Sequence, residues 1–519
     1  MTALESVPQA PPVGTDDMAA NRWSRWSDRL NPILVREVQQ AVKGRAFVLT
    51  VFLALGIGVV IAIAAAGEQQ HRGGGGGRMA FDAGLATLAP LLVFVVPMGA
   101  FQSMRLELRG GIVEQLLLSE LRPWRIIAGK LCAAMVQFVL YVAVLAPLLA
   151  TSYLLRGVDL PTIAMSLLFA LLFCIAATSF AISSAAQGML PALQGLTNLA
   201  VAFGLGVTSF GLVGYIGSGE YVRDLGWLLR SRELGMVTSL VAGGGLAGSV
   251  LSALTAQSFL AHAFENRSTG FRTFLFGMVL LCYGWMWLFV DASNWGEAMP
   301  VMTYFLVMLG AVFGIFMTTE QQVLSPRARA HVPRSPLLAA LAAPLLPGRD
   351  RGMACLVLYL GLVGAIAWCA WPTSGPRYFL DGISRLLGFT VAYVMIYLTI
   401  AKTVRGRLPA TVVGNHLARF LVPFLVFLFS IVPVLLDVLL RGGVRNWHLG
   451  HVMDPFFTIE DQAFRRDRGD TVLWGVVIAG LVALALQLPS LARGFLEVQA
   501  ASALRRQQAA SKPENGETA

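Results

Sequence analysis

Long apolar runs with almost no charge constrain this chain more than any other feature of its sequence. A helix needs roughly 20 apolar residues to cross the hydrocarbon layer of a membrane, and about twelve runs reach that length. Only 13% of the 519 residues are charged, too few to cover a soluble protein of this size. We therefore predict an all-α polytopic membrane protein with about 12 transmembrane helices in two six-helix halves. The spans are expected near residues 46–66, 84–104, 131–155, 162–186, 192–216, 236–260, 272–291, 299–319, 352–371, 383–401, 418–440 and 471–492.

The positions of Lys and Arg predict the orientation. With a cytoplasmic N-terminus, about two thirds of the 39 Lys and Arg residues fall in cytoplasmic segments, as the positive-inside bias requires. The segment 441–470 is an exception, because its arginines fall on the predicted outer side. We expect a multi-pass protein of the bacterial inner membrane with both termini in the cytoplasm. The net charge of +10 then reflects contact with anionic lipid and no binding of nucleic acid.

The same patterns divide the chain into segments. The polar start contains no apolar core of a signal peptide, and the run Gly73–Gly77 is predicted to be a flexible external tether. The five cysteines show no CxxC spacing and are expected to be buried and reduced. The expected segments are a disordered cytoplasmic tail (1–21), an amphipathic helix (22–45), six spans (46–260), two spans with a basic, Pro-rich cytoplasmic loop (261–350), four further spans (351–492) and a polar cytoplasmic tail (493–519).

A short amphipathic helix is predicted before the first span. Asn31 can cap it, Pro32 suits its first position, where no N–H is needed, and Gly44 suits its end. Charged residues such as Glu37 are expected away from the apolar stripe. We expect this helix to lie in the cytoplasmic membrane interface; a plain polar lead-in to the first span is the alternative. Its interfacial residues are expected to be Trp23, Trp26, Leu34 and Val38.

The segment between the second and third spans is unusually long and is also amphipathic. Pro123 divides it into two short helices, and apolar residues recur there at helical spacing among charges. A cytoplasmic helix with an apolar face and no predicted partner in the chain favours docking in a groove on another protein. Packing against the chain's own helices is the alternative.

These two segments resemble parts of the ATP-binding-cassette (ABC) type 2 permease family. The run NPILVREVQQAVKGRAF, from Asn31, resembles the elbow helix of that family. The loop resembles its coupling-helix region in order and spacing, but not closely in identity: Leu-Glu-Leu stands for a Glu-Arg-Glu cluster, and Gly-Ile-Val-Glu for Gly-Thr-Leu-Glu. The resemblance covers about residues 31–260 and rests in the loop on Glu107, Gly111–Glu114, Leu116–Ser119, Arg122–Trp124 and Gly129–Leu131.

The resemblance implies the permease subunit of an ATP-driven transporter, in the exporter class. A separate ATP-binding subunit would dock on the loop 105–130. Gly129–Lys130 is no phosphate-binding loop, because the required earlier glycine is missing and Leu131 replaces Ser or Thr. We therefore expect no enzyme activity and no cofactor in this chain, and either a homodimer, a second permease or a fused pseudo-dimer of its two halves. The expected contacts with the ATPase are Glu107, Arg109, Glu114, Leu117, Leu121, Pro123 and Trp124.

Three other classes were weighed. A 12-span secondary transporter would place a tight Gly-Asp-Arg loop where this chain has a long one, and a membrane enzyme of the zinc type would carry HExxH. A scaffold that recruits partners without transport fits the same docking helix. Mid-span charges that could carry protons are rare, since Asp437 lies near a span end. His448, His451 and Asp454 have a spacing compatible with a metal site, but an ordinary interfacial loop is favoured, so no metal is expected.

Overall fold

The computed structural model describes residues 32–72, 75–118, 122–187, 191–261, 265–291, 294–322, 324–330, 332–369, 377–409, 412–441, 449–464 and 469–510. Every regular element in these ranges is a helix. Among them, 12 helices are long and apolar enough to cross a membrane, which confirms the all-α polytopic prediction. Trp23, Trp26, Leu121 and His448 lie outside the described residues, as do the predicted N-terminal tail and residues 511–519. Residues 493–510 of the predicted C-terminal tail are helical. The twelve helices are Arg45–His71, Gly76–Arg109, Pro123–Leu154, Leu160–Ala186, Gln194–Gly217, Leu234–Leu260, Thr269–Phe289, Ala298–Thr318, Arg349–Cys369, Ser384–Arg407, His416–Leu440 and Thr471–Gln508.

The chain forms two compact units. Unit 1 comprises Met1–Gln187, Thr197–Leu234 and Val241–Ala256, and unit 2 comprises Gly188–Leu196, Gly235–Leu240 and Gln257–Ala519. Helices α9 (Pro191–Gly217) and α11 (Leu234–Leu260) contain residues of both units. The other helices of unit 1 are α2 (Pro32–Lys43), α3 (Arg45–Arg72), α4 (Gly76–Pro90), the π-helical η1 (Leu91–Val95), α5 (Val96–Arg109), α6 (Ile112–Leu118), α7 (Pro123–Leu154), α8 (Leu160–Ala186) and α10 (Glu220–Arg230).

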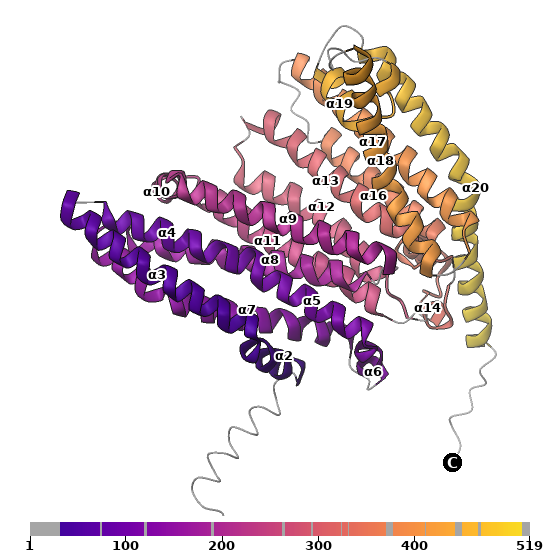
Figure 1. The fold of residues 1–519 in the computed structure, drawn as a ribbon. Coiled ribbons are helices and arrows are strands. Elements are labelled where there is room, and N and C mark those ends of the chain that lie inside the picture. The colour runs from indigo at the N-terminus through magenta and orange to yellow at the C-terminus, as the bar shows by residue number, and fades with distance from the viewer. Residues whose placement is uncertain are drawn as a thin grey trace, which may run out of the picture. The chain divides into compact units, whose positions relative to one another are not determined.

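Unit 2 contains long helices joined by several short helices (Figure 1). α20 has 42 residues, more than a bilayer requires, so part of it extends beyond the hydrocarbon layer. The helices are α12 (Thr269–Phe289), α13 (Trp295–Thr318), α14 (Pro326–Ala330), α15 (Pro336–Ala342), η3 (Ala343–Leu345), α16 (Arg349–Cys369), α17 (Arg377–Arg407), α18 (Val412–Arg441), η4 (Leu449–His451), α19 (Pro455–Phe464) and α20 (Gly469–Ala510).

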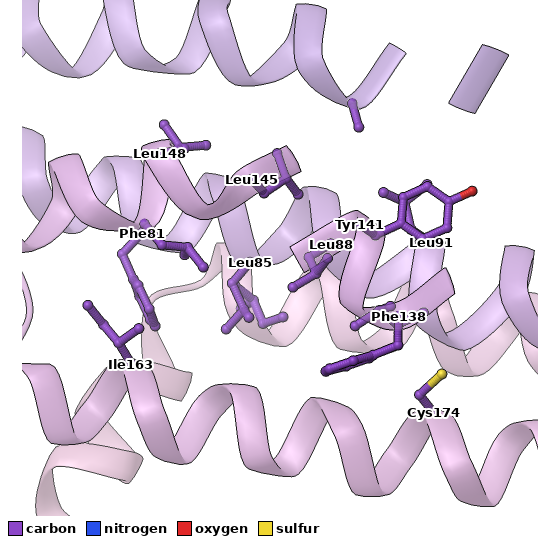
Figure 2. Close-up of a cluster of buried hydrophobic side chains, with 14 of the residues drawn as sticks. Phe81, Leu85, Leu88, Leu91, Phe138, Tyr141, Leu145, Leu148, Ile163 and Cys174 are labelled. Carbon is purple, nitrogen blue, oxygen red and sulfur yellow. The ribbon is translucent and has the colours of Figure 1, made fainter. Parts of the chain in front are cut away.

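The core of unit 1 lies between α4, α7 and α8. Figure 2 shows Phe81, Leu88, Phe138 and other apolar side chains from these helices turned toward one another. Tyr141 is buried beside them and shares a hydrogen bond of 2.7 Å with the hydroxyl of Thr50 on α3. Apolar side chains on the other face of α3 are exposed, as lipid contact permits, so this helix is apolar all round.

The glycine run between α3 and α4 is not simply a tether. Gly76 and Gly77 are the first residues of α4, and both are buried. A Cβ added to Gly77 would lie 2.7 Å from the backbone nitrogen of Gly157, so only glycine permits this close approach. Gly75 adopts φ 98°, in the left-handed region. The tether prediction is therefore wrong for Gly75–Gly77, while Gly73 and Gly74 lie outside the described residues.

The cysteines agree only in part with the prediction. All five are free, and Cys174, Cys282 and Cys355 are buried. Cys132 and Cys369 are exposed, so for these two the expected burial is wrong. Both lie in apolar spans, where an exposed side chain faces the lipid or a partner helix.

Candidate functional site

The two segments that stand out in the sequence lie together at one end of unit 1. Figure 1 shows α2 and α6 near the junction of α5 and α7, whereas α10 lies at the opposite end of the unit. α2 begins at Pro32 and ends at Lys43, with Gly44 just outside it, and these limits agree with the sequence prediction. α2 packs along the first turns of α7.

The side of α2 that faces the chain differs from the expected one. Ile33 and Glu37, one turn apart, are buried, whereas Leu34 and Val38 are half-buried beside them. The sequence prediction that Glu37 lies on the solvent side is therefore wrong. Its burial has a local cause, because its carboxylate accepts hydrogen bonds from Lys130 Nζ at 2.7 Å and from Ser103 Oγ at 2.8 Å.

Two carboxylates and two cations form a network at this position. Lys130 Nζ lies 2.7 Å from Glu37 Oε1 and 2.9 Å from Glu107 Oε2. Arg36 pairs with Glu107 and lies 3.3 Å from Glu37. Ser103 accepts a further hydrogen bond from Lys130 at 2.7 Å. We call these five residues (Arg36, Glu37, Ser103, Glu107 and Lys130) the root network.

The root network joins three helices. Its residues come from α2, α5 and α7, and its formal charges cancel. Buried charges are tolerated when each is paired, whereas removal of one partner leaves an uncompensated charge at a cost of about 3–5 kcal/mol. The network therefore holds the end of α5 and the start of α7 against α2, and it fixes where the intervening loop leaves the unit.

The loop beyond this network presents apolar side chains outward. α5 ends at Arg109, and Gly111 turns the chain with φ 67°. α6 then packs mainly on the end of α5, through the buried Val113. Leu118 is 78% exposed and Ile112 is 38% exposed. Such a surface is unusual for a segment that also carries charges, and it suits contact with another molecule.

The residues expected to contact a partner fall into three groups. Arg109, Glu114 and Trp124 are exposed, and Leu117 and Pro123 are half-buried. Glu107 is buried within the root network, where its carboxylate pairs with Lys130. Leu121 lies outside the described residues.

Ser103 and Lys130 belong to the root network, although neither is predicted from the sequence to be a functional residue. Two signals were present. Ser103 and Glu107 are one turn apart on the same helix face, and Lys130 is a lone cation among the apolar residues that begin α7. Lys130 is only 2% exposed, which a cation reaches only with a partner.

Two of the residues in unit 2 whose spacing is compatible with a metal site, His451 and Asp454, have separate partners. His451 pairs with Asp437, and their Nε2 and Oδ2 atoms are 2.9 Å apart. Asp454 instead accepts a hydrogen bond from Ser430 at 2.9 Å. Within the described ranges, no group of three or more His, Cys, Asp or Glu side chains is suited to hold a metal ion.

The structure is that of a many-pass membrane protein in which an exposed apolar loop begins and ends beside the root network. Comparison with known proteins adds no relative, since no family model, no curated protein and no solved structure matches this chain.

Proposed function

We propose that this chain is the transmembrane permease subunit of an ATP-driven ABC transporter, an exporter energised by a separate ATP-binding subunit. That subunit would dock on α6 and on the first turn of α7. The observation that carries the proposal is the exposed apolar surface of α6, between the second and third spans. The resemblance of the same segments to type 2 permeases supports it.

The root network gives this surface a mechanical role. A partner that moves α6 also moves α5, because α6 packs on its last turn. The paired charges connect α5 to α7 and α2, so a displacement of the loop reaches two spans and the interfacial helix together. A loop held only by flexible backbone would not transmit such a displacement.

The chemistry of the surface suits a protein partner. Leu118 and Trp124 provide apolar anchors, and Arg109 and Glu114 are exposed in the same stretch of the chain. Interfaces of this kind combine a few buried anchors with a polar rim, and the anchors carry most of the binding energy. We expect an apolar cleft on the ATPase to receive Leu118 and the exposed edge of Trp124.

The test is the substitution Leu118→Asp in the full chain. The affinity-tagged chain would be purified from its native host, and the co-purifying proteins identified by mass spectrometry. We expect the wild-type chain to co-purify with a subunit that carries Walker and signature motifs. The amount of this subunit recovered with Leu118→Asp should be at least about tenfold lower, since anchor residues contribute about 2 kcal/mol or more to binding. Size-exclusion profiles in detergent should be unchanged.

The matched control is Leu504→Asp, which alters an exposed leucine near the end of α20. This variant should retain the ATPase. Absence of such an ATPase from the wild-type preparation, or its normal retention by Leu118→Asp, would contradict the proposal.

A further inference from the structure

A group of cations lies where α16, α17 and α20 meet in unit 2. α20 packs along α17 and also contacts α16 (Figure 1). The Nζ atom of Lys402, on α17, lies 3.1 Å from Asp350 Oδ1 on α16 and donates a hydrogen bond of 2.6 Å to Ser490 Oγ on α20. Lys402 therefore joins the three helices, and both Lys402 and Asp350 are buried.

Two further cations lie beside this ion pair. Arg349 is the first residue of α16, and its Nε is 3.8 Å from Asp350 Oδ1, too far for a hydrogen bond. Arg493 lies one turn after Ser490 on α20. Arg349 and Arg493 are both close enough to Lys402 to repel its charge. We call these five residues (Arg349, Asp350, Lys402, Ser490 and Arg493) the cationic cluster.

The cationic cluster carries an excess of positive charge. It contains three cations and one carboxylate, whereas the charges of the root network cancel. Glu497, also on α20, does not correct the balance, because it pairs with Arg351 at 2.6 Å. Arg405, buried on α17, adds a further positive charge near Arg349. Like charges at close range repel, and buried charges are stable only when they are paired. A further anion would therefore stabilise this part of unit 2.

The side chains of the cluster range from buried to exposed. Lys402 is 3% exposed, Arg349 and Ser490 are half-buried, and Arg493 is exposed. Gly406, exposed on α17, has no side chain to cover Arg349, and a Cβ there would lie 2.9 Å from Arg349 Nη1. The Arg349 Nε atom is shielded from solvent and makes no hydrogen bond to any residue that the structure describes. A ligand that approaches from the exposed side of the cluster would meet guanidinium groups first.

We propose that the cationic cluster binds an anionic phosphate group, carried by a phospholipid headgroup or present as free phosphate. Phosphate oxygens suit guanidinium and ammonium donors, whose charge-assisted hydrogen bonds are about twice as strong as neutral ones. Arg349 and Arg493 would supply guanidinium donors. Lys402 uses two of its three N–H donors on Asp350 and Ser490 and would supply the third. The bound group would balance the excess charge and hold α16, α17 and α20 together. This inference does not depend on ATP or on a partner subunit.

Thermal unfolding of the full chain in lipid-depleted detergent tests the proposal. The chain would be titrated separately with inorganic phosphate, phosphatidylglycerol and phosphatidylcholine at constant ionic strength. We expect a saturable rise of the unfolding midpoint with at least one of the first two, and a much smaller rise with phosphatidylcholine, whose headgroup has no net charge. A rise with inorganic phosphate would assign the site to the free anion, and a rise with phosphatidylglycerol alone would assign it to a lipid headgroup. No rise with either would overturn the proposal.

Matched variants separate this site from a general attraction of anions to a basic surface. Arg349→Gln should lower the apparent affinity for the stabilising ligand at least about tenfold, since it removes charge-assisted hydrogen bonds. Arg506→Gln makes the same change at an exposed position of α20 and should bind as wild type. Unchanged affinity in Arg349→Gln, or an equal loss of affinity in Arg506→Gln, would contradict the proposed site.

The unliganded protein gives a second measurement. Without added ligand, Arg349→Gln should unfold at the same temperature as wild type or higher, because Asp350 keeps Lys402 as its partner and a repelled cation is removed. A lower midpoint would show that the charge of Arg349 is already balanced within the chain, and would count against an anion site.

Discussion

Both units pair an acidic residue near the end of their second span with an arginine at or before their first span, yet their connecting loops differ. In unit 1, Glu107 pairs with Arg36 of α2 and lies 2.9 Å from Lys130. In unit 2, Glu320 follows α13 and pairs at 2.7 Å with Arg272, in the first turn of α12. In each case the acid also contacts the chain near the third span, and in unit 2 this contact is the backbone N–H of Gly348 at 3.0 Å.

The loops that leave these two sites have different surroundings. In unit 2, α14 and α15 pack on α20 through a small core that includes Ala328, Ala339 and Val498. The Ser502 hydroxyl also donates to the carbonyl of Arg334 at 3.0 Å. α15 still exposes three leucines, but its opposite face is fixed to the chain. In unit 1, α6 packs mainly on α5. The buried charges set where each loop leaves its helices, but they do not cover the loop. The loop without its own core is therefore the one suited to a partner.

The largest effect is expected for Arg272→Met. Arg272 is fully buried and also donates to the carbonyls of Pro344 at 2.8 Å and Leu346 at 2.6 Å, so its loss leaves a carboxylate and two carbonyls without that donor. We expect a loss of at least about 3–5 kcal/mol and faster hydrogen exchange in 336–348. Thermal unfolding in detergent measures the first effect. The exposed Arg327→Met should change stability by less than about 1 kcal/mol. An equally small change for Arg272→Met would show that the Arg272–Glu320 pair does not stabilise unit 2.

A slightly smaller effect is expected for Lys130→Met in unit 1. The substitution leaves Glu37 and Glu107 with Arg36 as their only partner cation in the root network, at a cost of about 3–5 kcal/mol. Thermal unfolding should show this loss, and Lys130→Arg should restore part of it. Lys43→Met, at the exposed end of α2, is the control. If Lys130→Met unfolded at the same temperature as wild type, α2 would not be held by these charges.

The smallest effect is expected for Ala339→Leu. Ala339 is fully buried between α15 and α20, and a larger side chain there should cost about 1–3 kcal/mol and loosen the loop of unit 2. Limited proteolysis between α14 and α16 would detect the loosening. Ala330→Leu, at an exposed position of α14, should have no effect. If Ala339→Leu were cleaved no faster than wild type, the core between α15 and α20 would not be what fixes the loop of unit 2.

Particular residues show where prediction from the sequence ended. Pro32 and Gly44 predicted the limits of α2, because capping and backbone preferences act locally. The burial of Glu37 could not be predicted in the same way, since it depends on Lys130, 93 residues later in the chain. Within the loop, Trp124 was expected to be available to a partner and is exposed, whereas Glu107 was expected at the surface and is buried.

The sequence by itself determined the class of protein, the number of spans and the approximate span limits. These follow from the length and composition of each apolar run, which the bilayer selects one helix at a time. Only the tertiary structure decided which polar residues face one another and that Gly77 meets Gly157. Such contacts join residues far apart in the chain. Helices that are apolar on all sides can pack in many ways, so a few paired charges and close glycine contacts determine which packing forms.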